Sequence, residues 1–320
     1  MSTAQLATPK TAAAVVPSLF NDPRFHALNG VEGVLLAGGD GERTVGALGG
    51  ALLDDGARFV SGHRAPFGGI DLVRERETPA GVGALVDDVL AQLAGRGVRE
   101  AVIRCPPARH HAAQETVVFA LLNRGFAVAE ADLSFHLDLT RFATPEDYAA
   151  ALRSPARRAL RHAAGEPWAV DEAGEDAAAW DEGFALLAAN RATKGRELSI
   201  DRAYAGRARR AFPHEIRLLA LRHAGRPVAA ALTYRVRPRV ELVVAWGDAG
   251  HALERSPMNR LAYEVVARAL AEGVELLDLG TSTLPGDQGR RVPNDGLIQF
   301  KHSVGASAQV RLVLRGELGR

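Results

Sequence analysis

The sequence contains a single cysteine, Cys105, among 320 residues. One thiol can form neither an internal disulfide framework nor a cysteine-based zinc site, so both are excluded. We expect Cys105 to be a reduced, buried, small hydrophobic residue. The neighbours His110 and His111 are too close together in sequence to share one metal comfortably and lack acidic or cysteine partners in a metal-binding pattern. No metal site is predicted.

The sequence also lacks a marked excess of charge and any long apolar run. A formal net charge of +1 gives no overall attraction to DNA or to a membrane, so anion binding must come from local patches. No segment approaches the ~20 apolar residues that a membrane span needs. The apolar run at residues 12–16 is too short for a signal-peptide core. We therefore expect a cytoplasmic protein with a flexible N-terminal tail over residues 1–22.

Lysine is nearly absent, since 36 of the 39 basic residues are arginine. Apart from Lys10 in the tail, the lysines are Lys194 and Lys301. A compact ammonium on a flexible stem can follow a developing charge where the planar arginine fork does not fit. For Lys194, a lysine kept by chance is as good an explanation as a functional role. For Lys301, the motif around it, described below, favours a functional role.

A chain of this length, with 47% hydrophobic and 24% charged residues, is expected to form two compact domains. An internal repeat supports this expectation, because strand-like segments recur at an offset of 183 residues. The matching positions are Leu35 with Leu218, Val45 with Val228, and Phe59 with Leu242.

Each copy then continues with an amphipathic helix, at 84–90 and 261–267, in which apolar residues recur every three or four positions. Gly97 and Gly273 are suited to end these helices in a left-handed conformation. A further strand follows in each copy. The predicted order in each copy is therefore three meandering strands, a helix, a strand and a further helix.

The segment between the copies contains an alternating strand at 126–139, a helix capped at Thr144, and a second short helix at 156–162. Arg157, Arg158 and Arg161 can gather on one side of this second helix. Guanidinium forks suit bidentate phosphate contacts. An ordinary solvated face is an equally good interpretation of these arginines.

The most informative motif stands near the end of the chain. Residues 276–283 read Leu-Leu-Asp-Leu-Gly-Thr-Ser-Thr, and after a polar loop residues 294–306 read Asn-Asp-Gly-Leu-Ile-Gln-Phe-Lys-His-Ser-Val-Gly-Ala. The pattern predicts a strand, a loop, and a short helix capped by Asn294. Asp-x-Gly followed at this distance by Gly-x-x-x-Phe-Lys-x-x-x-Gly resembles the Fem family of peptidyl and aminoacyl transferases and its relatives. That family is a branch of the GNAT acyltransferase superfamily.

This resemblance implies a role for Lys301 in stabilising the donor or the transition state of acyl transfer. A fixed cation at the developing oxyanion can lower the barrier by roughly 3 to 4 kcal/mol. Asp278, at the carboxyl end of a central strand, could orient the acceptor amine or help to remove its proton. A purely structural role, in which Asp278 fixes the turn of its own Asp-x-Gly motif, explains this residue nearly as well. The motif also supplies the predicted substrate-binding residues Gly280, Ser282, Asn294 and Phe300.

Two further segments complete the predicted site. The stretch from Trp246 to Asn259 also follows the Fem pattern, so both residues are predicted to bind substrate. Arg191 and Lys194, together with the arginines at 157, 158 and 161, are predicted to bind the donor or another anion. In the first copy, residues 67–69 (Phe67, Gly68 and Gly69) are predicted to line the acceptor cleft, because adjacent glycines permit close backbone approach. That copy has no counterpart of the Phe-Lys motif and is expected to be catalytically degenerate.

The resemblance has one departure that concerns the donor. GNAT enzymes cradle the pyrophosphate of acetyl-CoA with a Gln/Arg-x-x-Gly-x-Gly/Ala loop at a helix N-terminus. Here residues 250–257 read Gly-His-Ala-Leu-Glu-Arg-Ser-Pro instead. This replacement slightly favours aminoacyl-tRNA over acyl-CoA as donor. The donor is expected to be a co-substrate, with no permanently bound cofactor.

These observations predict an α/β (α+β) protein with two tandem GNAT-type domains, each a mixed, mostly antiparallel sheet flanked by helices. The degenerate domain is placed at 23–140 and the catalytic domain at 141–320. The predicted activity is N-acyl transfer to an amine on a peptide, sugar or metabolite. The alternative is a catalytically silent duplicated domain that binds an envelope precursor, a partner protein or RNA.

Overall fold

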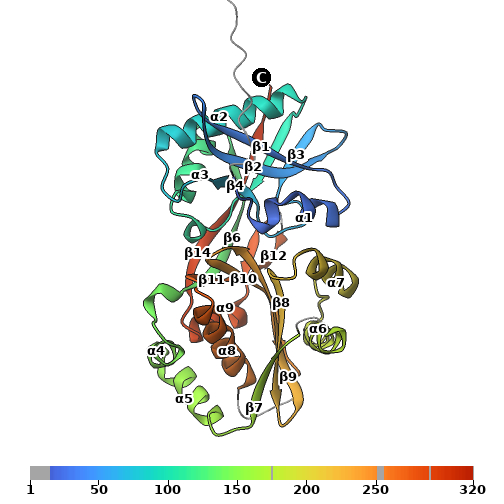
Figure 1. The fold of residues 1–320 in the computed structure, drawn as a ribbon, viewed down its shortest axis with the longest axis vertical. Helices are drawn as coiled ribbons and strands as arrows, with labels where there is room; N and C mark the ends of the chain where they lie inside the picture. Colours follow the sequence, from blue (N-terminus) through green and yellow to red (C-terminus); the bar gives the residue numbers. More distant parts are fainter. Residues whose placement is uncertain (1–14, 174–175, 251–255, 288–289, 320) are drawn as a thin grey trace, which may run out of the picture. The chain divides into compact units, whose positions relative to one another are not determined.

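The computed structural model describes residues 15–173, 176–250, 256–287 and 290–319. Contacts divide the chain into two compact units (Figure 1). Unit 1 comprises Met1–Asp132, Gly286–Arg291 and Val310–Arg320, and unit 2 comprises Leu133–Pro285 and Val292–Gln309. Residues 310–320 therefore belong with unit 1, whereas the sequence placed everything after residue 140 in one domain. The reason is that the end of the chain pairs with a strand of unit 1, from Val313 opposite Arg104 to Glu317 opposite Glu100.

Unit 1 is a mixed sheet covered by helices. Its strand order is β1-β2-β3-β5-β14, with β4 paired to β2. Helix α2 packs across β1 and β2, and α3 packs against α2. The elements are η2 (Leu19–Asn21), α1 (Pro23–Leu28), β1 (Gly33–Asp40), β2 (Arg43–Leu53), β3 (Arg58–Ser61), β4 (Gly69–Leu72), α2 (Pro79–Gly95), β5 (Glu100–Arg104), η3 (Ala108–His110), α3 (Gln114–Leu122), and parts of β6 (Ala127–Asp138) and β14 (Ser307–Glu317).

The N-terminal tail predicted for residues 1–22 lies outside the described residues up to residue 14, but residues 18–21 are buried. Phe20 is 1% exposed. The buried carboxylate of Asp71 accepts hydrogen bonds from the Ser18 amide at 2.8 Å and from the Asn21 side chain at 2.7 Å. These buried polar contacts hold the segment against the rest of unit 1. The prediction of a flexible tail up to residue 22 is therefore wrong for its last residues.

Unit 2 contains the larger number of helices among the described residues. Its strand order is β6-β11-β10-β9-β8-β7, and β12 and β13 form a separate two-stranded sheet. In Figure 1, α6 and α7 lie on one side of β8 and β9, and α8 lies on the other side with α4 and α5. The elements are η4 (Leu139–Arg141), α4 (Pro145–Ala151), α5 (Ser154–Ala163), β7 (Trp168–Glu172), α6 (Ala177–Ala192), α7 (Arg202–Ala211), β8 (Ile216–His223), β9 (Arg226–Arg237), β10 (Val240–Asp248), α8 (Pro257–Ala271), β11 (Leu276–Thr281), β12 (Thr283–Pro285), β13 (Arg291–Pro293) and α9 (Asp295–Ser303).

The predicted α/β class, with mostly antiparallel sheets flanked by helices, is confirmed. Local signals explain several boundaries. Helix α4 begins with a capping box in which Thr144 and Asp147 bond reciprocally, and Pro145 occupies its first turn. Gly97 and Gly273 follow α2 and α8 with φ of 84° and 70°, as expected for left-handed helix ends.

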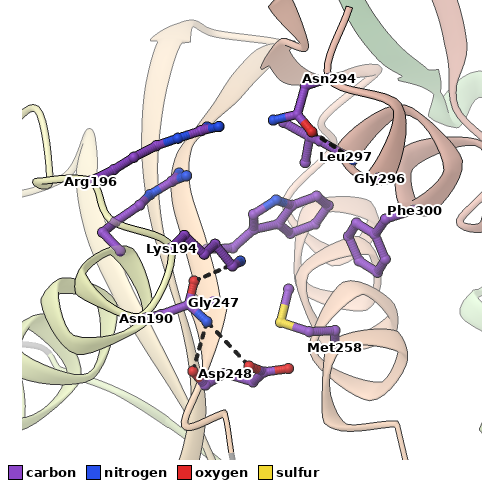
Figure 2. A pocket seen from close by; sticks show the side chains of 12 residues that line it. Asn190, Lys194, Arg196, Gly247, Asp248, Met258, Asn294, Gly296, Leu297 and Phe300 are labelled. Atoms are coloured by element: carbon purple, nitrogen blue, oxygen red, sulfur yellow. Dashed lines mark hydrogen bonds between the residues drawn. The ribbon is translucent and has the colours of Figure 1, made fainter. Parts of the chain in front are cut away.

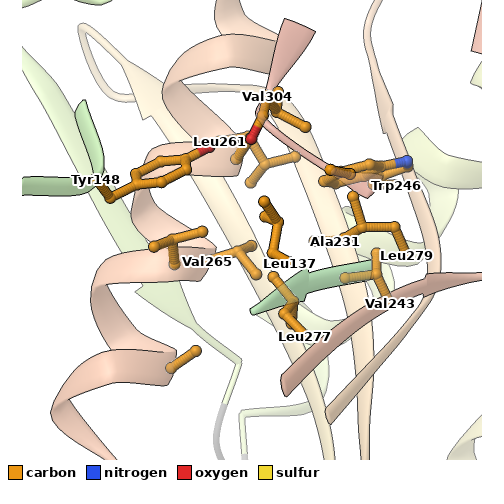
Figure 3. Close-up of a cluster of buried hydrophobic side chains, with 14 of the residues drawn as sticks. Leu137, Tyr148, Ala231, Val243, Trp246, Leu261, Val265, Leu277, Leu279 and Val304 are labelled. Carbon is orange, nitrogen blue, oxygen red and sulfur yellow. Dashed lines mark hydrogen bonds between the residues drawn. The ribbon is translucent and has the colours of Figure 1, made fainter. Parts of the chain in front are cut away.

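The core of unit 2 lies between α8 and the sheet (Figure 3). Leu261 and Val265 of α8 are fully buried with Leu277 of β11, which matches the three- and four-residue spacing of the apolar positions in the helix. The buried hydroxyl of Tyr148 donates a 3.0 Å hydrogen bond to the Val304 carbonyl. This bond ties α4 to the end of α9, the helix that carries Lys301.

The repeat extends to the pairing of individual residues. In the first copy Leu35 pairs with Gly49, and 183 residues later Leu218 pairs with Leu232. The correspondence continues to the hairpin end, and both hairpins shift register at the same point, after Gly38 in β1 and after Leu221 in β8. A shared bulge at a shared register is a feature of local backbone geometry that random similarity does not produce. The two hairpins therefore have one geometry.

The candidate site lies where two parallel strands of unit 2 diverge. Strand β10 pairs with β11 from Val240–Leu276 to Leu242–Asp278. Beyond that point β10 continues along β9 to Asp248, while β11 continues along β6. The register of β11 against β6 shifts between Asp278 and Gly280, and Gly280 has a φ of 71°. The bulge turns the end of β11 at this point.

Candidate functional site

A cleft of about 310 Å³ lies within unit 2 (Figure 2). The end of α6 and the following turn form one side, the end of β10 forms the floor, and the first turns of α8 and α9 form the other side. The lining residues are Asn190, Arg191, Lys194, Arg196, Trp246, Gly247, Asp248, Met258, Asn294, Gly296, Leu297 and Phe300.

Asn190 connects the α6 side of the cleft to its floor. Its side-chain amide donates to the Asp248 carbonyl at 2.8 Å and to the Asp248 carboxylate at 3.2 Å, and its side-chain oxygen accepts a 3.0 Å hydrogen bond from Lys194 (Figure 2). A side chain at Gly247 would meet Asn190 at 2.5 Å. The glycine therefore allows the close approach that this network requires.

The α6 side of the cleft is cationic. Burial, with a further contribution from the nearby Arg196 guanidinium, lowers the pKa of Arg191 below its usual value. Within the part of the chain that the structure describes, no carboxylate forms an ion pair with Arg191, Lys194 or Arg196. The cleft thus holds like charges close together.

The opposite side is apolar and aromatic. The rings of Trp246 and Phe300 meet edge to face with centroids 5.1 Å apart. Met258 and Leu297 extend this surface. Asn294 fixes the start of α9 as predicted, because its side-chain oxygen accepts a hydrogen bond from the Leu297 amide at 3.3 Å. A ligand with an apolar or aromatic part fits against this wall.

Lys301 follows Phe300 on α9 but is itself 1% exposed. Its ammonium donates to the Gly280 carbonyl at 2.8 Å and to the Thr281 carbonyl at 2.9 Å, and it lies 5.4 Å from the centre of the Phe135 ring. Burial lowers the pKa of Lys301 to about 7, partly opposed by the negative charge of Asp278. An ammonium has three N–H donors, so these two bonds leave one for another acceptor.

Asp278 is also 1% exposed and acts on the same turn. Its carboxylate accepts a 2.7 Å hydrogen bond from the Gly280 amide, and the Ser134 hydroxyl lies 3.5 Å away. Lys301 therefore bonds to the carbonyl of Gly280 and Asp278 to its amide, so both side chains hold the same residue. The geometry of Asp278 is that of an aspartate that fixes its own turn. It also places a negative charge near the buried amine.

The structure brings some of the predicted site residues together and leaves others apart. Trp246, Asn294, Phe300, Arg191 and Lys194 line the cleft, and Asn259 follows Met258 on α8.

Two other predicted residues, Gly280 and Ser282, lie around the end of β11. Gly280 and Ser282 lie beside Lys301, and the buried Ser282 hydroxyl has no hydrogen-bond partner among the described residues.

Two predicted groups lie elsewhere. Arg158 and Arg161 are exposed on α5, while Arg157 donates to the Ala150 carbonyl. Residues 67–69 (Phe67, Gly68, Gly69) belong to unit 1, where the Phe67 ring packs against Phe20 and His110. Their predicted roles rest on the sequence alone.

Sequence reasoning missed Asn190, Arg196 and Asp248 as site residues. The spacing of Asn190 and Lys194, four apart at the end of a helix, was the available signal. Arg196 carries no distinguishing pattern in an arginine-rich chain. Asp248 lines the cleft only because the end of β10 lies beside α6.

Across residues 15–173, 176–250, 256–287 and 290–319, no group of three histidine, cysteine, aspartate or glutamate side chains is arranged to hold a metal ion. No helix in these described ranges combines the length and apolar character required to cross a membrane.

Comparisons with known proteins agree with this geometry. Residues 150–289 match the acetyltransferase (GNAT) domain family. A crystal structure of FemX superposes with a TM-score of 0.72 at 10% identity, covering 95% of this chain and 93% of that one. L-PGS from Bacillus licheniformis gives a TM-score of 0.56 at 14% identity, covering 94% and 93%. The C-terminal domain of a putative lysylphosphatidylglycerol synthetase from Agrobacterium fabrum gives 0.54 at 14% identity, covering 90% and 84%. A comparison with curated protein sequences gave no match.

Residues 150–289 thus form a GNAT acetyltransferase domain, which contains the α6, β10 and α8 parts of the cleft. The fold of the whole chain is similar to that of FemX. The predicted resemblance to Fem-like members of the GNAT superfamily is confirmed, and acyltransferase is the class of enzyme that the domain supports.

Proposed function

We propose that unit 2 is an N-acyltransferase that moves an acyl or aminoacyl group from an activated ester or thioester to an amine. The observation that carries this proposal is the buried Lys301 amine at the bulged end of β11, next to a cleft in a GNAT domain. Structural ion pairs account for most buried cations, but Lys301 bonds to backbone carbonyls and retains one donor.

In the proposed reaction the amine nitrogen attacks the carbonyl carbon of the donor. A C–N bond forms, the C–O or C–S bond to the leaving group breaks, and the amine proton ends on the leaving alcohol or thiol. Negative charge grows on the carbonyl oxygen as the amine attacks. The remaining N–H of Lys301 can donate to that oxygen, and the low dielectric around a buried amine strengthens the interaction. The half-buried Gly280 is where the carbonyl would approach.

Backbone geometry at the start of α8 supports aminoacyl-tRNA slightly over acyl-CoA as donor. A pyrophosphate cradle uses free amides of the first helical turn. Here Pro257 has no N–H, and the amide of Asn259 already donates to the Ser256 carbonyl. In this turn the amide of Met258 remains. Most of residues 250–257, where the usual phosphate loop is replaced, lie outside the described residues.

The proposal is tested by separate incubation of the protein with labelled acetyl-CoA and with labelled aminoacyl-tRNA, in an extract of cellular amines. Wild type is compared with Lys301→Met, which keeps an unbranched apolar stem. Arg239→Gln is the control, because Arg239 forms an exposed ion pair with Glu275 and lies at the other end of β10. We expect a labelled amide with one donor, lost in Lys301→Met and retained in Arg239→Gln. Transfer from neither donor would favour a silent binding domain.

A further inference from the structure

The hydrogen bonds of the Lys301 amine match its neutral form better than its charged form. They go to the carbonyls of Gly280 and Thr281, at 2.8 and 2.9 Å. A protonated amine has three N–H groups and no lone pair, whereas a neutral amine has two N–H groups and one lone pair. The two carbonyls therefore satisfy both donors of the neutral form. They leave one N–H of the charged form without a partner, which is unfavourable in a side chain that is 1% exposed.

The surroundings of this amine also favour the neutral form before substrate binds. Within the residues that the structure describes, no carboxylate forms an ion pair with Lys301. Burial is the main cause that lowers its pKa to about 7, the charge of Asp278 on β11 opposes this shift, and the positive charge of Arg191 on α6 adds to it. A buried ammonium without a bonded counter-ion is costly, so the hydrogen bonds and the electrostatics agree.

Two histidines complete the titratable surroundings of Lys301. On α9 itself, His302 is exposed, and its Nδ1 lies 3.3 Å from the Ala306 carbonyl. On β6, His136 is buried opposite Asp278 in the pairing of β6 with β11. The Asp278 carboxylate accepts the amide of its own turn. Lys301, in contrast, combines a lone pair with a position beside the half-buried turn where the donor carbonyl would approach.

We propose that Lys301 is the general base of acyl transfer, a neutral amine at rest that takes a proton from the attacking nitrogen and then serves as the cation at the oxyanion. This inference rests on the proposed N-acyl transfer and identifies the group that moves its proton. As the acceptor nitrogen bonds to the carbonyl carbon of the donor, one of its protons passes to the lone pair of Lys301. The third N–H formed in this way donates to the carbonyl oxygen. When the C–O or C–S bond breaks, Lys301 gives a proton to the leaving oxygen or sulfur and is neutral again.

Nuclear magnetic resonance can follow the protonation of Lys301 directly, because the chain contains so few lysines. Protein isotope-labelled at the lysine Cε carbon is titrated without substrate, and the resonance that is missing from Lys301→Met belongs to Lys301. We expect a titration midpoint near 7 instead of the ordinary 10.5. Arg191→Gln should raise this midpoint by removing a positive charge, and Asp278→Asn should lower it by removing a negative charge. The control Arg239→Gln, which alters an exposed ion pair away from the site, should leave it unchanged.

The pH dependence of transfer shows which form of Lys301 is active. Hydroxylamine is the acceptor probe, because it is small and stays largely neutral near neutral pH. Hydroxamate formation from acetyl-CoA or aminoacyl-tRNA is expressed per neutral hydroxylamine, after subtraction of the rate with Lys301→Met. We expect this rate to rise about tenfold from pH 6 to pH 8, since the neutral fraction of an amine with a pKa of about 7 rises by that factor. A lysine that acts only as a fixed cation would give a fall of the same size.

The outcomes distinguish this inference from the proposed function. A Lys301 midpoint nearer to 10.5 than to 7, or a rate that does not rise between pH 6 and pH 8, would overturn the inference and leave N-acyl transfer intact. Absence of a Lys301-dependent hydroxamate, while amides still form in the extract of cellular amines, would do the same. A midpoint near 7 with transfer from neither donor to any acceptor would instead remove the enzymatic function, and the inference with it.

Discussion

Replacing Lys301 with methionine is expected to abolish most acyl transfer and to stabilise unit 2 at neutral pH. In the native protein, burial lowers the pKa of Lys301 from its usual value of 10.5 to about 7. A depression of this size corresponds to about 4 kcal/mol of lost stability at pH 7. Methionine fills similar space and carries no charge, so the variant avoids this cost.

Two opposing effects set the net change. Loss of the hydrogen bonds to the Gly280 and Thr281 carbonyls costs about 1 kcal/mol each. The net gain at pH 7 is therefore about 2 kcal/mol, a rise in the melting temperature on the order of 5 °C. Between pH 7 and 10.5 the unfolded chain retains a proton on Lys301 that the folded chain has released, so wild-type stability increases with pH. The advantage of methionine should shrink by about 2 kcal/mol between pH 7 and pH 9.

Urea unfolding followed by circular dichroism at pH 7 and pH 9 measures these differences. The rate of acyl transfer at pH 7, measured on the same samples, should fall by about 10²- to 10³-fold, the usual effect of removing one oxyanion donor. A methionine variant that is less stable than wild type at pH 7, or whose gain is the same at both pH values, would refute the electrostatic reasoning. Full activity in a stabilised variant would show that Lys301 is not part of the reaction.

The remaining predictions concern other buried groups. Because burial lowers the pKa of His26, the folded chain loses stability as pH falls below about 6.5, and His26→Leu should flatten that loss, by at most about 1.4 kcal/mol per pH unit in urea titrations. Gly247→Ala should destabilise unit 2 by about 1 to 3 kcal/mol through its clash with Asn190, whereas Gly296→Ala, whose added methyl meets nothing, should be neutral or slightly stabilising in thermal melts. Burial raises the pKa of Cys105 to about 12, so a thiol reagent should label it only after unfolding; rapid native labelling would contradict its burial.

Periodicity and local signals predicted most of the fold because those signals act over short stretches of chain. The capping residues at Thr144 and Asn294 bond to amides three residues away, so their sequence neighbours alone determine them. The duplicated hairpins were detectable because apolar alternation survives where side-chain identity does not. The destination of the C-terminal strand was not predictable, since pairing between β14 and β5 joins residues more than 200 positions apart.

The candidate site was predicted in part for the same reason. Trp246, Asn294 and Phe300 belong to motifs at the ends of elements, and these ends meet at the cleft. The burial of Lys301 could not be read from its motif, because it depends on how α9 packs over the end of β11. Asp248 and Arg196 became site residues only through tertiary packing between segments that are distant in sequence.

The pairing of the last strand with β5 has a consequence for synthesis of the protein. Leu314 is fully buried in the core of unit 1, although the rest of that core is encoded by residues before 132. A ribosome releases these earlier residues first, and the β14 residues of this core emerge only after residues 133–309. Of the two units, unit 1 therefore begins to emerge before unit 2 but is completed after it. Until β14 arrives, β5 presents an unpaired edge that the nascent chain must keep from other strands.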